Sequence, residues 1–323
     1  MSSRKQFYEQ QLDEKRKDLA RVQRDLAGDN TQEEERRLNN RAEQLLEDIE
    51  ELEGKLDSVH QDKQTVNQKN SHWEQHLYKI DYKEAGNLID STLNLIEQKF
   101  RAVLFVLEKS TEYSGKYCIQ HLRDRLEKQG VVDYPYHVDF LPGTTLTPEI
   151  FLRNLVEKLQ IKLDRSVTIA CEKALDGICQ SAKGRSILFL HINLELSDFD
   201  EDFLEWAIHD FWCGLVDRLP QLSKHNRYIK LVGVISIDET LQKTQTEKLC
   251  CTESELHPTK LLRLPLEKWA EPEIHRWLCS FSRLELEDET LADIAKQIFK
   301  RSNKGIPDSA ERRLLESLEK LAS

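Results

Sequence analysis

Residues 102–117 read AVLFVLEKSTEYSGKY, an apolar run followed by a polar segment. It opens with the continuous apolar run Ala102–Leu107, which is bounded by polar residues on both sides. Such a run is typical of a strand that is buried on both faces of a parallel sheet. A polar loop follows, and the residues after Gly115 have the pattern of a helix. We therefore expect a strand, a loop and a helix here, as at the start of an α/β domain.

The same alternation of strand and helix recurs along the rest of the chain. Further strands are expected at residues 136–140 (YHVDF), 186–192 (SILFLHI), 228–237 (YIKLVGVISI) and 260–264 (KLLRL). Helices are expected at residues 122–128, 148–163, 167–182 and 202–218. This alternation predicts a parallel sheet with helices on both faces, in which the run Ala102–Leu107 lies inside the sheet rather than at an edge. Residues 269–322 are expected to be all helical and to form a C-terminal lid.

A highly charged segment precedes the α/β sequence. A break at Gly28-Asp29-Asn30 separates two helical stretches, and Thr31 with Glu34 forms a capping box that starts the second one. The second stretch has a seven-residue apolar period, which predicts a left-handed coiled coil, and the short turn makes the two helices antiparallel neighbours. Its seam consists of Leu38, Ala42, Leu45, Ile49, Leu52, Leu56 and Val59. Two interpretations stay open: the seam associates with a partner or another copy, or the arm is a solvated spacer.

Composition and charge limit what the chain can do. The formal net charge of -11 argues against general nucleic-acid affinity, because phosphate binding needs clustered Lys and Arg. No apolar run approaches the roughly 18 to 20 residues of a membrane span, and the N-terminus has no apolar signal core. The seven cysteines are odd in number and contain no CxxC pair. We expect a cytoplasmic protein with reduced thiols, no metal site and no membrane span.

The loop after the first strand has the spacing of a phosphate-binding loop but not its residues. That motif is Gly, four residues, Gly-Lys and then Ser or Thr. Serine at the first position limits the backbone angles that point amides at a phosphate, and tyrosine at the last removes the small hydroxyl that ligates magnesium. Glu108 and Glu112 add negative charge where a triphosphate would lie. The four motif positions are held by Ser110, Gly115, Lys116 and Tyr117.

A second requirement of an NTPase is an acidic magnesium ligand at the end of a buried strand. In the strand expected at 186–192, His191 takes that place, and Glu195 lies beyond Asn193. His191 is either a ligand or a satisfied buried side chain, and neither role restores the carboxylate. Cys118 opens the next helix, where it is either a thiol of lowered pKa or a core residue. With magnesium ligands missing at both places, we expect no nucleotide hydrolysis.

These pieces, in this order, resemble the STAND class of signalling NTPases, and more closely the inactive STAND domain of bacterial conflict and signalling proteins. The resemblance rests on the lead-in Leu77-Tyr78-Lys79-Ile80-Asp81-Tyr82, the eroded loop ending SGKYCIQHL and the strand ILFLHIN. Gly305-Ile306-Pro307 is similar to the Gly-x-Pro of STAND lids, whose proline lies near the adenine. The resemblance runs from about residue 73 to the C-terminus. It implies a vestigial nucleotide cleft, without a cofactor, made by Ser110, Gly115, Lys116, Tyr117, His191 and Pro307.

The expected organisation is a P-loop NTPase-like α/β domain at 101–266 with a helical lid at 267–323. A helical hairpin at 1–66, forming an antiparallel coiled coil, and a linker with a lead-in helix at 67–100 precede it. The resemblance implies a pseudo-NTPase that acts as a signalling or scaffold protein in a bacterial defence or signal-transduction system. Self-association or effector binding would use Leu38, Leu45, Ile49, Leu52, Leu56 and Val59. The alternatives are a nucleotide-switched protein that binds ATP or GTP weakly through Lys116, and a structural adaptor with an empty cleft.

Overall fold

The computed structural model describes residues 73–322, apart from 81, 131, 141–143, 160–165, 182–186, 196–199 and 226–228, together with residues 15, 17, 18, 22, 41 and 45. The chain divides into two units, Met1–Glu74 with Leu321–Ser323, and Gln75–Lys320. Of the six seam residues predicted to mediate association, Leu45 is described, and it is helical and buried. The others (Leu38, Ile49, Leu52, Leu56 and Val59), and the predicted turn of the hairpin, lie outside the described residues.

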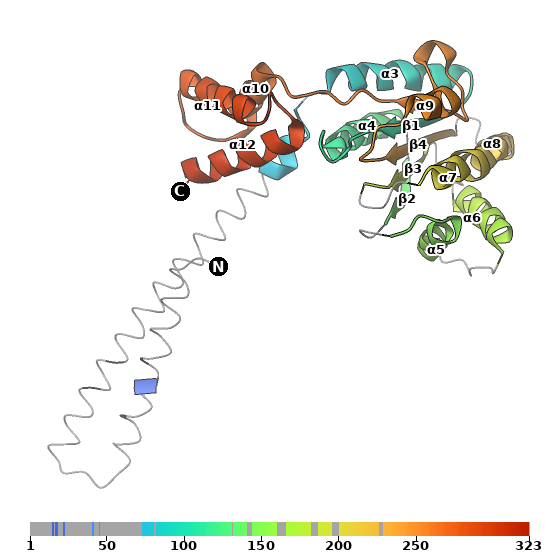
Figure 1. Cartoon of the computed structure of the whole chain (residues 1–323), viewed down its shortest axis with the longest axis horizontal. Helices are drawn as coiled ribbons and strands as arrows, with labels where there is room; N and C mark the ends of the chain where they lie inside the picture. Colours follow the sequence, from blue (N-terminus) through green and yellow to red (C-terminus); the bar gives the residue numbers. More distant parts are fainter. Residues whose placement is uncertain are drawn as a thin grey trace, which may run out of the picture. The chain divides into compact units, whose positions relative to one another are not determined.

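A six-stranded sheet forms the centre of the second unit (Figure 1). The spatial order is β2-β3-β4-β1-β6-β5, and every neighbouring pair is parallel. The predicted inner position of β1 is confirmed, because it pairs with β4 on one side and β6 on the other. The short strand β5 is an addition to the prediction. The strands are β1 Ala102–Leu107, β2 Val132–Asp139, β3 Ile187–Asn193, β4 Lys230–Ser236, β5 Cys250–Cys251 and β6 Leu261–Arg263.

Helices cover both faces of this sheet, as predicted (Figure 1). The helices before and after β1, α3 (Lys83–Gln98) and α4 (Gly115–Gln129), lie on one face, where Lys230 of β4 contacts Glu97 and Gln129. On the other face are α5 (Pro148–Lys158), α6 (Val167–Ser181), α7 (Glu201–Trp206) and α8 (Cys213–His225). The single helix predicted at 202–218 is instead α7 and α8 joined by the π-helical turn η1 (Ala207–Trp212).

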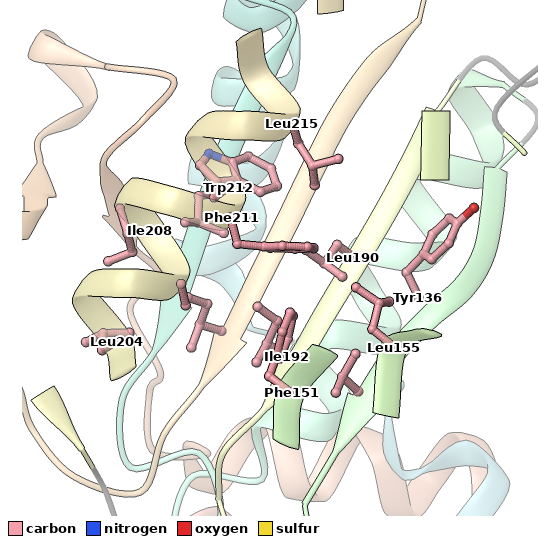
Figure 2. Close-up of a cluster of buried hydrophobic side chains, with 14 of the residues drawn as sticks. Tyr136, Phe151, Leu155, Leu190, Ile192, Leu204, Ile208, Phe211, Trp212 and Leu215 are labelled. Carbon is pink, nitrogen blue, oxygen red and sulfur yellow. The ribbon is translucent and has the colours of Figure 1, made fainter. Parts of the chain in front are cut away.

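The main core lies between the sheet and helices α5 to α8 (Figure 2). Phe151 of α5 packs edge-on against Phe211 of η1, with ring centroids 4.8 Å apart. Trp212 crosses Gly233 of β4 so closely that a Cβ on Gly233 would lie 2.6 Å from the indole. The indole Nε1 donates to the carbonyl of Pro258 at 2.7 Å, so the one polar atom of this ring is satisfied. The π-helical turn thus places two aromatic rings over the middle of the sheet.

The C-terminal part of the described chain is helical, as predicted for a lid. After α9 (Lys243–Leu249) and the short η2 (Glu253–Glu255), the chain forms α10 (Glu271–Phe281), α11 (Asp288–Arg301) and α12 (Pro307–Ala322). Pro272 lies in the first turn of α10, where a missing amide proton costs nothing. Helix α12 begins at Pro307, the last residue of the Gly305-Ile306-Pro307 motif. Among the described residues, no helix combines the length and the apolar character that crossing a bilayer requires.

Candidate functional site: a loop closed by the lid

The loop between β1 and α4 uses its backbone amides inside the fold. Lys109 and Ser114 have positive φ angles of 51° and 48°, so the loop is tightly curled as a phosphate-binding loop would be. A phosphate-binding loop directs its amides at the anion. Here seven amides donate to protein acceptors instead, which leaves few of them for a ligand. The donors are the amides of Lys109, Ser110, Thr111, Tyr113, Ser114, Gly115 and Tyr117.

Side chains hold this curled loop from two directions. The Ser110 hydroxyl lies against Gly115, where an added Cβ would be 2.0 Å from Ser110 Oγ. Glycine is therefore required at 115 to make room for the serine that replaces the first motif glycine. Asp238, which follows β4, accepts from both the amide and the hydroxyl of Thr111 at 2.8 Å. Groups of the protein thus hold the loop in its conformation, a role that a bound nucleotide could otherwise have.

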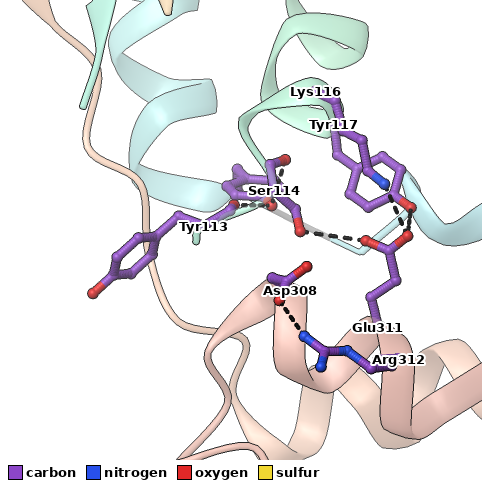
Figure 3. A network of polar contacts seen from close by, with 8 residues as sticks. Tyr113, Ser114, Lys116, Tyr117, Asp308, Glu311 and Arg312 are labelled. Carbon is purple, nitrogen blue, oxygen red and sulfur yellow. Dashed lines mark hydrogen bonds and ion pairs between the residues drawn. The ribbon is translucent and has the colours of Figure 1, made fainter. Parts of the chain in front are cut away.

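The Glu311 carboxylate of α12 lies directly over the remaining polar groups of the loop (Figure 3). One oxygen, Oε1, is 2.9 Å from Lys116 Nζ and accepts from the Tyr117 hydroxyl at 2.8 Å. The other oxygen, Oε2, accepts from the Ser114 hydroxyl at 3.3 Å. The Glu311 side chain is only 15% exposed, whereas that of Lys116 is 61% exposed. A carboxylate of α12 is therefore bonded to the motif lysine and to the tyrosine that replaces the motif Ser or Thr.

The lid is also joined to the loop through backbone atoms. The Asp308 amide donates to the Glu112 carbonyl at 3.1 Å, next to the buried Pro307. Pro307, predicted from its Gly-x-Pro motif to be a cleft residue, is therefore brought to the loop. Gly305 has a φ of 84°, and a Cβ there would lie 1.9 Å from the carbonyl oxygen of Trp269. The Gly-Ile-Pro segment is thus a tight turn that fixes the start of α12 beside the loop.

A tyrosine of the lead-in segment, Tyr82, also bonds to the backbone of the loop. Tyr82 is buried, and its hydroxyl donates to the carbonyls of Tyr113 at 2.8 Å and Ser114 at 3.2 Å. Burial is the main reason why the pKa of Tyr82 lies well above its ordinary value, so the hydroxyl stays a donor. Burial likewise raises the pKa of the Cys118 thiol to about 12. Of the two roles considered for Cys118, the core residue is confirmed and the activated thiol is wrong.

The carboxylate of Glu108 has partners within the protein. Its carboxylate forms an ion pair with Arg263 of β6 and accepts from the Leu241 amide at 3.1 Å. The negative charge of Glu108 is compensated within the sheet, because the parallel pairing of β1 and β6 brings Arg263 beside it. Glu112 is 3.9 Å from Lys109 and is partly exposed. The negative charge that the sequence places at Glu108 is therefore paired with an arginine of the protein.

His191 lies in the sheet rather than at the loop. It is buried, its Nε2 is 2.9 Å from the Ser236 hydroxyl, and its ring is 4.5 Å from the ring of His137. Burial is the largest cause of a pKa well below its ordinary value, and His137 and Arg123 add to it. A neutral imidazole bonded to a serine through Nε2 matches the buried side chain considered from the sequence, but it is only half satisfied, because Nδ1 is buried without a hydrogen-bond partner in the described part of the chain. It is not joined to Ser110, Gly115, Lys116 and Tyr117, which the structure does bring together.

Acidic side chains follow the strands near the loop. Burial is the main reason why the pKa of the Glu195 carboxyl is raised, and the charges of Asp238 and Asp139 act in the same direction. In the part of the chain that the structure describes, these carboxylates do not converge on a common point as magnesium ligands would. Their negative charge instead makes this end of the sheet unfavourable for a triphosphate.

A pocket with a volume of about 490 Å³ lies beside the loop. This is enough for a small ligand. Lys116 and Tyr117 do not line it, although two other cationic residues, Lys109 and Arg263, do. Its lining residues are Glu108, Lys109, Tyr113, Thr240, Arg263, Leu264, Pro265 and Leu266.

Sequence reasoning missed Glu311, Asp238 and Tyr82 as residues of this site. Glu311 and Asp238 each lie far along the chain from the loop, and nothing in their local sequence distinguishes them from other surface carboxylates. Tyr82 belongs to the lead-in motif, but the sequence alone predicts no role for it in the loop. The first two could be found only from the fold, which places the end of β4 and the start of α12 at the loop.

The geometry agrees with the comparison to known families. Residues 77–233 match the inactive STAND family. The match contains the lead-in segment, the loop and strands β1 to β3, and it ends within β4, so the lid lies outside it. No curated protein matches the chain. The match assigns residues 77–233 of this chain to the inactive STAND family.

Proposed function

We propose that this chain is a non-catalytic signalling scaffold whose inactive STAND domain keeps its phosphate loop closed by its own lid. The observation that carries the proposal is the Glu311 carboxylate on Lys116, Tyr117 and Ser114. A carboxylate supplies the negative charge and the acceptor oxygens that a phosphate would bring. The loop is then complete without a ligand.

Hydrolysis would need groups that this site does not offer. Tyr117 replaces the small hydroxyl that ligates magnesium, and His191 replaces the acidic strand residue. Loss of one group that stabilises transition-state charge commonly costs about 3 to 4 kcal/mol. Two such losses would slow turnover by roughly four to six orders of magnitude. Purified protein should therefore show no magnesium-dependent ATP or GTP hydrolysis above background.

The scaffold role is proposed to depend on the N-terminal segment. The heptad seam around Leu45 and Ile49 presents an apolar stripe that needs a partner helix, either from another copy or from an effector. The setting, a bacterial defence or signal-transduction system, is proposed from the family resemblance. In this account the inactive STAND domain contributes a fixed structure, and association supplies the signal.

Light scattering on the full chain tests this function. The wild-type mass should exceed that of a monomer and should not change when magnesium and ATP are added. Leu45→Asp with Ile49→Asp should lower the mass, because each buried Leu or Ile contributes roughly 1.5 to 3 kcal/mol. The matched control, Ile169→Asp, changes a side chain that is 48% exposed in α6 and should leave the mass unchanged. A monomer in every sample would exclude self-association and leave effector binding as the scaffold mode.

The second candidate is a nucleotide-switched protein, and the pocket beside the loop favours it. A nucleotide base could occupy that volume if the lid released Lys116. A mass that changes on addition of ATP, together with loss of this change in Lys116→Ala, would replace the scaffold proposal with the switch.

A further inference from the structure

Three side chains of unlike chemistry meet between α10 and α11, away from the loop. His275 and Cys279 are four residues apart on α10 and so lie on the same face of that helix. Asp288 is the first residue of α11. The two helices are fixed by their buried faces, with Ile274 and Leu278 on one and Leu291 on the other. The meeting of the three side chains is therefore set by the fold.

The donor atoms of these side chains lie at the corners of a small triangle. His275 Nε2 is 3.4 Å from Cys279 Sγ and 3.2 Å from Asp288 Oδ1, and Cys279 Sγ is 3.4 Å from Asp288 Oδ1. Zinc binds nitrogen and oxygen at about 2.0 to 2.2 Å and sulfur at about 2.3 Å. Two such ligands at a tetrahedral angle are separated by about 3.3 to 3.6 Å. The observed triangle is close to one face of that tetrahedron.

We propose that His275, Cys279 and Asp288 form a binding site for Zn²⁺. One imidazole, one thiolate and one carboxylate are ligands that zinc accepts, and the thiolate selects against magnesium and calcium. Because Cys279 and Asp288 are exposed, the fourth position is open to water. The neighbouring Glu285, Glu287 and Glu289 add negative charge that attracts a cation. The ion would pin the start of α11 to α10.

This site is independent of the closed loop and of the proposed function. Without metal, the three groups hydrogen-bond to one another, with Asp288 also favoured at a helix N-terminus. Metal binding must displace the thiol proton, because the thiolate is the ligand. A hydrogen-bonded helix junction releases no proton when zinc is added, so proton release separates the two roles.

Co²⁺ and Zn²⁺ titrations of the reduced full chain test the proposal. We expect one equivalent of Co²⁺ to give thiolate charge-transfer absorption and visible bands whose intensity is typical of tetrahedral Co²⁺. Zn²⁺ should displace the Co²⁺, and metal binding should release a proton. Cys279→Ser should weaken binding by at least about 100-fold, since even outer-sphere changes cost 10- to 100-fold. Asp288→Asn should weaken binding as well, with helicity unchanged by circular dichroism.

The matched control is Cys251→Ser, which removes a thiol from the adjacent pair Cys250-Cys251 and should leave the titration unchanged. Zinc should also raise the melting temperature of the wild type but not of Cys279→Ser. The proposal is overturned if no equivalent of metal binds, or if Cys279→Ser binds Co²⁺ as tightly as the wild type. Loss of binding in Cys251→Ser alone would overturn it too, by placing the ion at the cysteine pair.

Discussion

Replacing Glu311 by alanine removes one acceptor that three loop groups share. The Tyr117 hydroxyl donates to the carboxylate at 2.8 Å in a partly buried place, and a hydrogen bond to a charged group contributes about 1.5 to 3 kcal/mol. The Lys116 ion pair is short, but the lysine side chain is 61% exposed, so water screens it to about 0 to 1 kcal/mol. The Ser114 bond, at 3.3 Å, is long and adds little. We expect Glu311→Ala to lower the free energy of unfolding by about 2 to 4 kcal/mol.

Urea denaturation followed by circular dichroism and tryptophan fluorescence measures this loss. The matched control on the same helix is Glu316→Ala, whose carboxylate pairs with Arg313 where both side chains are nearly half exposed. That pair should contribute no more than about 0.5 kcal/mol. A Glu311→Ala variant that is no less stable than Glu316→Ala would show that this carboxylate does not hold α12 against the loop.

A double-mutant cycle isolates the central contact. Tyr117→Phe removes one hydroxyl, and Glu311→Gln keeps the shape of the acceptor while removing its charge. If the two groups are bonded, their effects are not additive, and the coupling energy should be at least about 1 kcal/mol. A coupling energy near zero would show that the two side chains act separately.

Three further predictions concern the structure around this contact. Gly305→Ala should destabilise the chain by at least about 1 kcal/mol in urea, because φ is 84° and the new Cβ would meet the Trp269 carbonyl; an unchanged midpoint would contradict this. Tyr82→Phe should cost about 1 to 3 kcal/mol and speed proteolysis of the loop, since the Tyr113 carbonyl loses a buried donor; unchanged proteolysis would mean that Tyr82 does not hold the loop. The pKa of His191 is lowered on folding, so the unfolded chain binds more protons below the ordinary value of 6.5. The contribution of His191 to stability should therefore fall as the pH drops below about 6.5 and be constant above it, and His191→Gln should flatten that slope; an equal slope in both proteins would assign it to other groups.

The sheet could be predicted because its strands are defined by local pattern. The run AVLFVL is apolar at every position, and it is buried at every position in β1. Strand β5 was missed because two residues, Cys250 and Cys251, carry no period at all. The π-helical turn was missed because Ala207–Trp212 reads as ordinary amphipathic helix. The turn places Trp212 against Gly233, a contact that only the folded chain reveals.

The loop could be predicted as damaged, but not as closed. Ser110 and Tyr117 depart from the motif in sequence, and both departures bear on the loop in the structure. The partner that completes the loop, Glu311, lies 195 residues away from Lys116 along the chain. This contact depends on the position of α12, which begins at Pro307 beside the loop. A glutamate in a charged helix has no local property that predicts it. The ion pair of Glu108 could not be predicted for the same reason, since its partner Arg263 comes from another strand.

The proposed zinc site was harder to predict from the sequence than the loop. His275 and Cys279 are one helical turn apart, which is a spacing that many helices contain by chance. Asp288 joins them only because α10 and α11 turn back on one another. The sequence rule that looks for CxxC pairs passes over such a group, and so the chain was expected to have no metal site.

Equilibrium dialysis of labelled ATP against the full chain, with and without magnesium, tests the closed loop most directly. Wild type, Lys116→Ala and Glu311→Ala should be compared at the same protein concentration. We expect no saturable ATP binding to the wild type and the same result for Lys116→Ala, because the lysine, the tyrosine and the loop amides already have partners in the protein. Saturable binding of ATP to the wild type that disappears in Lys116→Ala would contradict the account, since the lid carboxylate would then have given way to a phosphate.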